Sequence, residues 1–218
     1  MEAPSTHYAA LHIEGSSPDV VNLAQKFRAL RLYALLHSPK SFSSTFEIES
    51  AWPLEFWVKR LARPGSEYFV IVAHSADAKD EWVGQVTLIG PLSEAVYALP
   101  PEANQPIVEN ETEETRWQIT ALYISDQHRG QGLAKLLCQA TFNFAAKFDA
   151  SKRARLRIMI HPDSLVVRGF YSSMGFINAG AVTLAEAYIS NGDAFLVPAD
   201  GGGEHFNSRI GLIMVKVV

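Results

Sequence analysis

The sequence lacks the features that a disulfide-bonded, metal-stapled or membrane protein needs. Its 218 residues include a single cysteine, Cys138, which excludes an internal disulfide and any zinc site built from several cysteines. No run of about 18 apolar residues occurs, which excludes a membrane-spanning helix and gives no reason to expect a membrane partner. The N-terminal MEAPSTHYAA has neither a basic start nor an apolar run, so we expect a cytoplasmic protein.

Basic residues are also scarce. Lys and Arg number 19 and Asp and Glu 23, which gives a formal net charge of −4. Because nonspecific binding of nucleic acid needs clustered Lys and Arg, this balance argues against a nucleic-acid partner. A chain of this length buries roughly 70% of its unfolded surface, so it needs no metal to fold. We therefore expect a soluble globular protein.

The hydrophobic spacing predicts one mixed α/β domain over residues 1–218. Val20, Leu23 and Phe27 recur at helical spacing within 19–36. Pro53 is placed to open a second helix that ends before Pro64. Further helices are expected after Gly132 and before Gly175. Strands are expected at 7–14, 68–73, 82–89, 116–124, 155–160, from 176 onward and at 210–218. Irregular connections are expected at 41–50 and 186–207.

Residues 91–115 differ from the rest of the chain. They hold four prolines and six acidic residues but no Lys or Arg. This composition is typical of a solvated insertion loop. The alternative is an acidic lid that attracts a cationic substrate.

The segment 122–134 joins a hydrophobic strand to an amphipathic helix through a turn with two glycines. Backbone amides at such a turn have no intrahelical partner and lie at the positive end of the helix dipole, where they bind a phosphate or pyrophosphate. Glycine lets the ligand oxygens approach the backbone without meeting a Cβ. The segment lacks the third glycine of a dinucleotide site and the Gly-Lys-Ser/Thr of a P-loop, so both of those interpretations are poor.

Two motifs carry a family resemblance. Gln127, Gly130 and Gly132 match the signature Q/R-x-x-G-x-G/A, and Tyr171 with Gly175 and the following Phe matches the end of N-x-x-A-x-x-x-Y-x-x-x-G-F. In both motifs the chain resembles the GNAT superfamily of acetyl-CoA-dependent N-acetyltransferases. The resemblance implies the GNAT fold, a mixed and mostly antiparallel sheet of about seven strands, splayed at the cofactor site and flanked by helices.

The resemblance also implies acetyl-CoA as co-substrate, no metal, and a role for each matching residue. Tyr171 would protonate the departing CoA thiolate, and the thioester would lie between Ile124 and the region of Ile160 and His161. Ser164 would contact the cofactor where the family often has Asn, with a shorter reach. The remaining cofactor contacts would come from the backbone of Leu122, Tyr123 and Ile124 along the pantetheine arm, and from Gln127, Arg129, Gly130, Gln131, Gly132, Leu133 and Ala134 around the pyrophosphate.

The general base stays open at this point. Acyl transfer to an amine needs a neutral nucleophile, and His161 titrates in the useful pH range. A relay of water molecules with no single base is an equal alternative. Other candidates are Glu114, Gln118, Glu186 and Asp193. Cys138 invites a covalent acyl-enzyme mechanism, but a free cysteine on a helix is typically buried and inert, so we expect direct transfer in a ternary complex.

The predicted acceptor is an amino group of a small molecule or peptide. The fold that the resemblance implies places the first helices and the last strands around the acceptor, and Phe46, Trp52 and Phe56 are our candidates to contact it. Further aromatic candidates are Phe42, Trp57, Tyr188, His205 and Phe206. The alternatives are a non-catalytic acyl-CoA sensor and an O-acyl or longer-chain transferase. The apolar C-terminal strand is compatible with a homodimer or with a central position in the sheet.

Overall fold

The computed structural model describes residues 6–75, 79–106, 110 and 112–218. The chain forms two compact units, one made of Met1–Leu88 with Ala121–Thr141 and the other of Ile89–Thr120 with Phe142–Val218. In the described residues seven strands hydrogen-bond in the order β1-β2-β3-β4-β5-β7-β6. The predicted mixed sheet with flanking helices is therefore confirmed. Within these same residues no helix combines the length and the apolarity that a membrane crossing requires.

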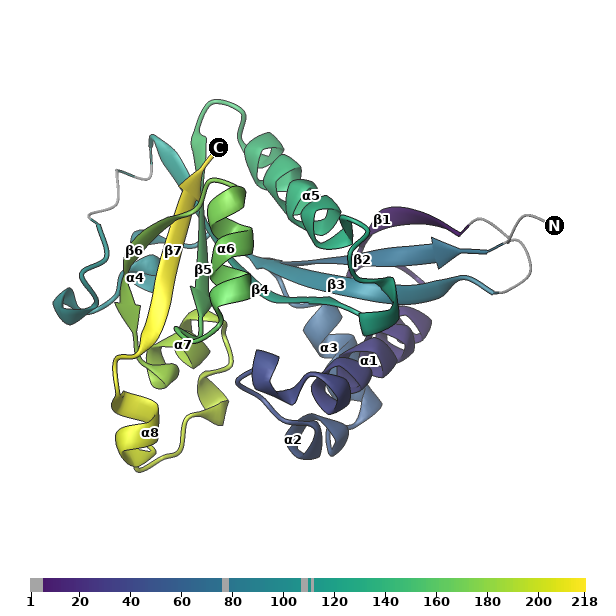
Figure 1. The fold of residues 1–218 in the computed structure, drawn as a ribbon, viewed down its shortest axis with the longest axis horizontal. Helices are drawn as coiled ribbons and strands as arrows, with labels where there is room; N and C mark the ends of the chain where they lie inside the picture. Colours follow the sequence, from purple (N-terminus) through teal and green to yellow (C-terminus); the bar gives the residue numbers. More distant parts are fainter. Residues whose placement is uncertain (1–5, 76–78, 107–109, 111) are drawn as a thin grey trace. The chain divides into compact units, whose positions relative to one another are not determined.

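The first unit is built on the strands β1, β2 and β3. Strand β1 runs antiparallel to β2, from the pair His7↔His74 to the pair Ile13↔Tyr68. Figure 1 shows α1 and α3 together on one face of these strands. Along the chain the elements are β1 (His7–Ile13), α1 (Val20–His37), η1 (Pro39–Ser41), α2 (Phe46–Ser50), α3 (Leu54–Leu61), β2 (Ser66–His74), β3 (Glu81–Ile89), the end of β4 (Glu114–Ile124), η3 (Asp126–His128) and the start of α5 (Leu133–Phe148).

The core of this unit explains why α1 and α3 form where the spacing predicts them. Phe27 of α1 lies with its ring centroid 6.2 Å from that of Trp57 of α3 and 5.2 Å from that of Tyr68 of β2. All three side chains are almost fully buried. Burial of a large aromatic side chain is worth about 1.5–3 kcal/mol, which outweighs the weak intrinsic helix propensity of these residues.

The connection 41–50, expected to be irregular, contains the short helix α2. The Thr45 side chain caps this helix by accepting a hydrogen bond from the Ile48 amide at 3.3 Å. Glu47 and Glu49 lie in its first turn, where the helix dipole favours negative charge. The prediction was wrong because a five-residue helix is too short to show a hydrophobic period.

The second unit contains the parallel strand pair of the sheet. Strand β4 pairs with β5 from Glu114↔Arg153 to Gln118↔Arg157. Strand β7 lies antiparallel between β5 and β6. The elements of this unit are α4 (Glu94–Tyr97), η2 (Pro101–Ala103), most of β4, the end of α5, β5 (Arg153–Ile160), α6 (Leu165–Ser173), β6 (Ile177–Val182), α7 (Leu184–Ser190), η4 (Ala194–Leu196), α8 (Gly203–Asn207) and β7 (Gly211–Val217).

The acidic insertion 91–115 is packed rather than fully solvated. Tyr97 and Ala103 are completely buried, and Ala103 belongs to the core around β6 and β7. Gly180 of β6 makes this close approach possible, because a Cβ there would collide with the Ala103 carbonyl oxygen. The expectation of a solvated loop is therefore corrected at these two positions. Residues 107–109 and 111 of the insertion lie outside the described residues.

The stretch 186–207 was also expected to be irregular, yet it carries helix. Helix α7 begins with a capping box, in which the Thr183 hydroxyl accepts from the Glu186 amide and the Glu186 carboxylate accepts from the Thr183 amide. The reciprocal pair satisfies two backbone donors at the helix start. Two shorter elements, η4 and α8, follow within the same stretch. The missed signal was Thr183 followed three residues later by Glu186.

Candidate functional site

The two glycines of the turn after β4 have a backbone conformation that favours glycine, a reason beyond the close approach that the sequence predicts. Gly130 and Gly132 have φ angles of +78° and +76°, in the left-handed region that favours glycine. A Cβ built on either residue meets no atom within 4 Å. Glycine is therefore needed for its backbone conformation, and the turn presents its main chain to open space. A phosphate group can approach such a turn closely.

The amides of this turn divide into two groups. The Arg129 amide donates to the Asp126 carbonyl oxygen at 3.3 Å, so it is used inside the turn η3. Helix α5 starts at Leu133, and amides in the first turn of a helix have no intrahelical acceptor. The Arg129 amide is therefore already engaged within the predicted pyrophosphate cradle from Arg129 to Ala134, and the amides of residues 130–134 could hold a diphosphate.

The Arg129 side chain holds the turn instead. Its Nε donates to the Ile124 carbonyl oxygen at 3.0 Å, and its Nη2 donates to the Ser38 hydroxyl at 3.1 Å. The guanidinium thus links the end of β4 to the residue that follows α1. The Ile124 carbonyl, predicted to pair with the pantetheine arm, already accepts one hydrogen bond.

Two tyrosines from distant segments fasten the same turn. The Tyr33 hydroxyl donates to the Asp126 carboxylate at 3.2 Å, and the Tyr8 hydroxyl lies 3.0 Å from His128 Nδ1. The sequence analysis missed Tyr8, Tyr33 and Ser38. No local signal marks them, because each lies about 90–120 positions from its partner in the turn.

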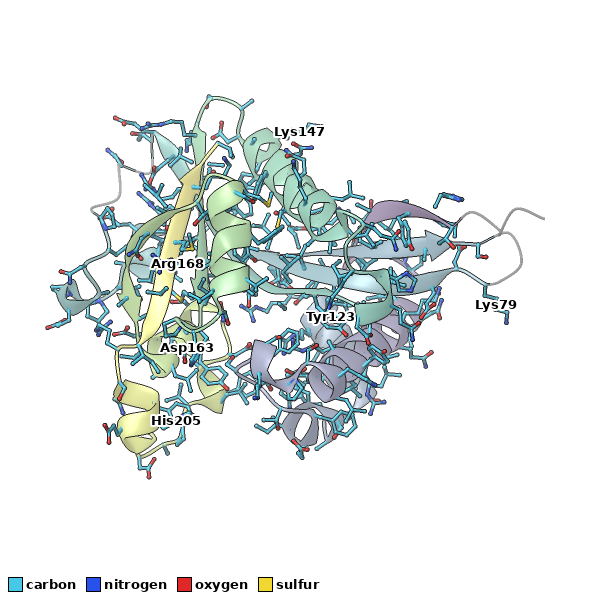
Figure 2. The ribbon with its side chains drawn as sticks, viewed as in Figure 1. Lys79, Tyr123, Lys147, Asp163, Arg168 and His205 are labelled. Atoms are coloured by element: carbon cyan, nitrogen blue, oxygen red, sulfur yellow. The ribbon has the colours of Figure 1, made fainter. Side chains whose placement is uncertain are left out.

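The strand before the turn ends in the core with Tyr123 and Ile124, whereas Leu122 is partly exposed. Tyr123 is 4% exposed and packs against Leu30 and Ala34 of α1 (Figure 2). Burial raises the pKa of Tyr123, so the phenol stays protonated at neutral pH. Ala121 has a φ of +57°, which is uncommon for a residue with a Cβ and marks a strained point in β4. Backbone pairing of β4 with β5 ends at Gln118, in agreement with the splayed strand that the resemblance implies.

Tyr171, the expected proton donor, lies on α6 in the second unit. Its side chain is 5% exposed, and its ring lies 5.1 Å from that of Phe170 and 5.3 Å from that of Phe176. Gly175 ends the helix with a φ of +88°. The Phe176 amide donates back to the Tyr171 carbonyl oxygen at 3.1 Å. The Tyr-x-x-x-Gly-Phe motif therefore sets the position of the phenol through a left-handed glycine and an aromatic cluster.

His161 and Ser164 lie between β5 and α6. The His161 side chain is 55% exposed, and its Nδ1 accepts from the Asp163 amide at 3.3 Å. Figure 2 labels Asp163 in this connection. Ser164 is the N-cap residue of α6, but its hydroxyl makes no capping hydrogen bond. The Ser164 hydroxyl is therefore not committed to capping the helix.

Three of the alternative base candidates have oxygens committed to arginines. Glu114 is 2% exposed, and both its oxygens accept from Arg155 Nε, at 2.9 and 3.0 Å. This hydrogen bond raises the pKa of Arg155. The Gln118 side-chain oxygen accepts from Arg157 at 2.6 Å, and the Glu186 carboxylate accepts from Arg209 at 2.6 and 2.7 Å. These contacts are stabilising pairs, which disfavours Glu114, Gln118 and Glu186 as proton acceptors. Asp193 lies just before η4.

Three aromatic acceptor candidates of the first unit, Trp52, Phe56 and Trp57, lie in mutual contact. Trp52 and Phe56 lie with their ring centroids 4.3 Å apart and are half-buried, as is Phe46, whereas Trp57 is completely buried. In the second unit the rings of Tyr188 and Phe206 stack at 6.1 Å, next to the exposed His205 on α8 (Figure 2). Trp57 is thus a core residue, whereas the partly exposed aromatic candidates leave ring surface that an acceptor can reach.

A buried ion pair fixes the segment that carries these aromatics. Arg31 of α1 donates to Glu49 of α2 from Nε at 3.0 Å and from Nη2 at 2.6 Å. The guanidinium also lies 4.5 Å from the ring centroid of Phe42. Both charged side chains are almost fully buried, at 8% and 1% exposure. Sequence reasoning missed this pair because the two residues are 18 positions apart on different helices.

Cys138 is completely buried on α5, as predicted. Burial raises the pKa of its thiol to about 12. The thiolate needed for a covalent acyl-enzyme is therefore scarce at neutral pH.

The fold and the glycine turn after β4 agree with one class of protein. Residues 30–176 match the family model of the acetyltransferase (GNAT) family. The match spans more than half of the chain, and the chain belongs to this family. No curated protein sequence matches the chain.

Solved structures agree at the level of the fold. A GNAT-family acetyltransferase from Streptococcus pneumoniae is 13% identical with a TM-score of 0.59, covering 97% of this chain and 99% of its own. Arabidopsis thaliana NAA60 in complex with acetyl-CoA is 14% identical with a TM-score of 0.57, covering 97% and 99%. A ribosomal-protein-S5-alanine acetyltransferase from Vibrio fischeri is 15% identical with a TM-score of 0.54, covering 97% and 93%. At these identities the likeness shows a common fold.

Proposed function

We propose that the protein transfers an acetyl group from acetyl-CoA to an amino group of a small-molecule or peptide acceptor. The observation that carries this proposal is the turn after β4, where left-handed Gly130 and Gly132 open the backbone amides to a diphosphate. Membership of the acetyltransferase family and the acetyl-CoA complex of the Arabidopsis relative support the choice of ligand.

Each part of the reaction has a candidate in this chain. Acetyl-CoA supplies a thioester, whose C–S bond breaks as the acceptor nitrogen forms a new bond to the carbonyl carbon. The amides of residues 130–134 bind the diphosphate, and the backbone of residues 122–124 lies along the pantetheine arm. Tyr171 gives its proton to the departing thiolate, because a phenol still carries its proton at neutral pH.

The proton lost by the amine passes to His161 or to water. The His161 side chain is 55% exposed, whereas Glu114 and Glu186 are paired with arginines. Asp193 is a further titratable candidate. Transfer is direct, because the thiol of Cys138 is buried and protonated. A direct mechanism gives intersecting lines in a double-reciprocal plot. Parallel lines that Cys138→Ser abolishes contradict it.

The experiment that tests the proposed function follows thiol release from acetyl-CoA across small amines, polyamines, amino acids and peptides. Release with one chemical class, and acetylated product by mass spectrometry, establishes the transferase and its acceptor class. An acetylated hydroxyl instead of an amine overturns N-acetylation. A rise in Tm with acetyl-CoA but no transfer to any acceptor favours an acyl-CoA sensor. Neither release nor a change in Tm refutes the assignment of the turn to acetyl-CoA.

A further inference from the structure

Among the described residues of the second unit, one buried arginine has no carboxylate partner. Arg157 of β5 is 0% exposed. Its Nε donates to the Gln118 side-chain oxygen at 2.6 Å. Its Nη1 donates to the Tyr97 carbonyl oxygen at 2.6 Å and to the Gln105 side-chain oxygen at 2.8 Å. All three acceptors are neutral.

Two polar groups at this position make no hydrogen bond within the described part of the chain. Arg157 Nη2 is buried and has no acceptor, and the hydroxyl of Tyr97 is buried and has no partner. The two groups belong to a stacked pair, because Arg157 Cζ lies 4.0 Å from the centroid of the Tyr97 ring. A buried donor without an acceptor costs about 1–3 kcal/mol, and more when the group is charged.

The buried carboxylate of β4 is engaged by other arginines. Glu114 on β4 is bound by Arg155 at 2.9 Å and lies 3.6 Å from Arg116 Nε. Glu114 therefore pairs with Arg155 and Arg116, whereas the acceptors of Arg157 are neutral. Burial lowers the pKa of Arg157 to about 10 and raises that of Tyr97 to about 12, so at neutral pH the guanidinium is charged and the phenol is protonated.

The position of this arginine is set by the parallel strand pair. Gln118 and Arg157 form the last backbone pair between β4 and β5, so the cluster marks the end of the parallel ladder. Guanidinium groups bind carboxylates through charge-assisted hydrogen bonds, and a buried site strengthens them. A carboxylate at this point would satisfy the Nη2 donor, the phenol donor and the unbalanced charge together.

We propose that Arg157 and the Tyr97 hydroxyl bind the carboxylate of a ligand, and that this ligand is the acetyl acceptor. The acceptor class is then an amine that also carries a carboxylate, such as an amino acid. The carboxylate site stands on the contacts above, whereas the assignment to the acceptor rests on the proposed function.

Formate, the smallest carboxylate, is the probe for the site. The Tm of the full-length protein is measured with sodium formate and with sodium chloride at equal ionic strength. We expect formate to raise the Tm by a few degrees relative to chloride. The matched variant is Gln118→Glu, which places a carboxylate against Arg157 Nε. It is expected to raise the Tm without formate and to lose the response to formate.

Two further variants make the result decisive. Arg157→Met removes the charge and should also lose the response to formate. Arg168→Met removes an exposed arginine of the same unit and should keep it. If Arg157→Met does not fold, Gln118→Glu alone decides. The carboxylate site is refuted if formate acts no differently from chloride, or if Gln118→Glu responds to formate as the wild type does.

A separate measurement tests the assignment to the acceptor. The kcat/KM of an amino acid is compared with that of its carboxamide, which keeps the amine and lacks the carboxylate. We expect a preference of about tenfold or more for the acid in the wild type, and its loss in Gln118→Glu. Equal rates for acid and amide overturn the acceptor assignment. Absence of transfer to every acceptor, together with a formate response, contradicts the proposed function and leaves the carboxylate site in place.

Discussion

Arg129 Nε donates a hydrogen bond to the carbonyl oxygen of Ile124 at 3.0 Å, five positions back in the chain. The same guanidinium reaches Ser38 from Nη2. One side chain therefore joins the strand that precedes the phosphate-binding turn to the C-cap of α1. The turn has its shape because this bridge closes it.

The bridge predicts that Arg129 supports acetyl-CoA binding through geometry as well as charge. We expect Arg129→Ala to raise the Kd for acetyl-CoA about tenfold, since a hydrogen bond from a charged group is worth about 1.5–3 kcal/mol. Arg129→Lys should raise the Kd by almost as much, because one ammonium group cannot replace the two hydrogen bonds that the guanidinium donates to Ile124 and Ser38. Calorimetric titration measures the Kd. Full binding by Arg129→Lys would show that only the charge matters.

The glycines of the turn should be sensitive for a backbone reason. Gly130→Ala and Gly132→Ala each place a Cβ on a left-handed residue, at a cost of about 1–2 kcal/mol. We expect both to reduce the rise in Tm that acetyl-CoA produces. The control is Gly169→Ala on α6, where a Cβ also meets no atom within 4 Å but the backbone is helical. That change should stabilise the protein by about 0.5–1 kcal/mol. Equal effects at all three positions would contradict the explanation.

Tyr171→Phe isolates the role of the hydroxyl. The phenyl ring keeps its contacts with Phe170 and Phe176, so the Tm should change little. We expect kcat to fall by roughly 10²-fold, the usual contribution of a general acid, with the KM for acetyl-CoA nearly unchanged. Steady-state kinetics and a melting curve are the measurements. An unaltered kcat would assign the proton to water.

The pair of Glu186 and Arg209 gives stability that depends on pH. Burial pushes the pKa of Glu186 upward, but the hydrogen bonds from Arg209 and from the Thr183 amide outweigh it and lower the pKa overall. A carboxyl with a lowered pKa stabilises the fold above its unfolded pKa of about 4.3, and this contribution is lost as pH falls through the folded pKa. Glu186→Gln should therefore lower the Tm at pH 7.

The difference in Tm between wild type and Glu186→Gln should shrink as the pH falls below about 4. Melting curves across pH 3–7 check this. A constant difference over that range would show that Glu186 acts through its uncharged capping hydrogen bonds alone.

Much of the candidate site was predictable because its requirements are local. A left-handed turn between a strand and a helix needs glycine, and Gly130 and Gly132 mark that turn in the sequence itself. Tyr171 and Gly175 likewise stand at a spacing set by a single helix and its end. The short helix α2 and the capping box of α7 were missed because each depends on a few hydrogen bonds rather than on a hydrophobic period.

The roles of the charged side chains were not predictable in the same way. Glu114 and Gln118 were candidate bases from their place in the chain, but their partners Arg155 and Arg157 lie about 40 positions away. Only the parallel pairing of β4 with β5 brings these groups together.

The fold class, the glycine turn after β4 and the place of Tyr171 on a helix that ends at Gly175 thus followed from the sequence alone. Hydrophobic period and backbone conformation depend on residues that are close together in the chain, so both can be predicted from the sequence. Only the folded chain shows which charges are neutralised, which hydroxyls hold the turn, and that Arg157 is buried without a counter-charge among the described residues. Those properties depend on contacts between groups that are far apart in the sequence, so no short segment of the chain predicts them.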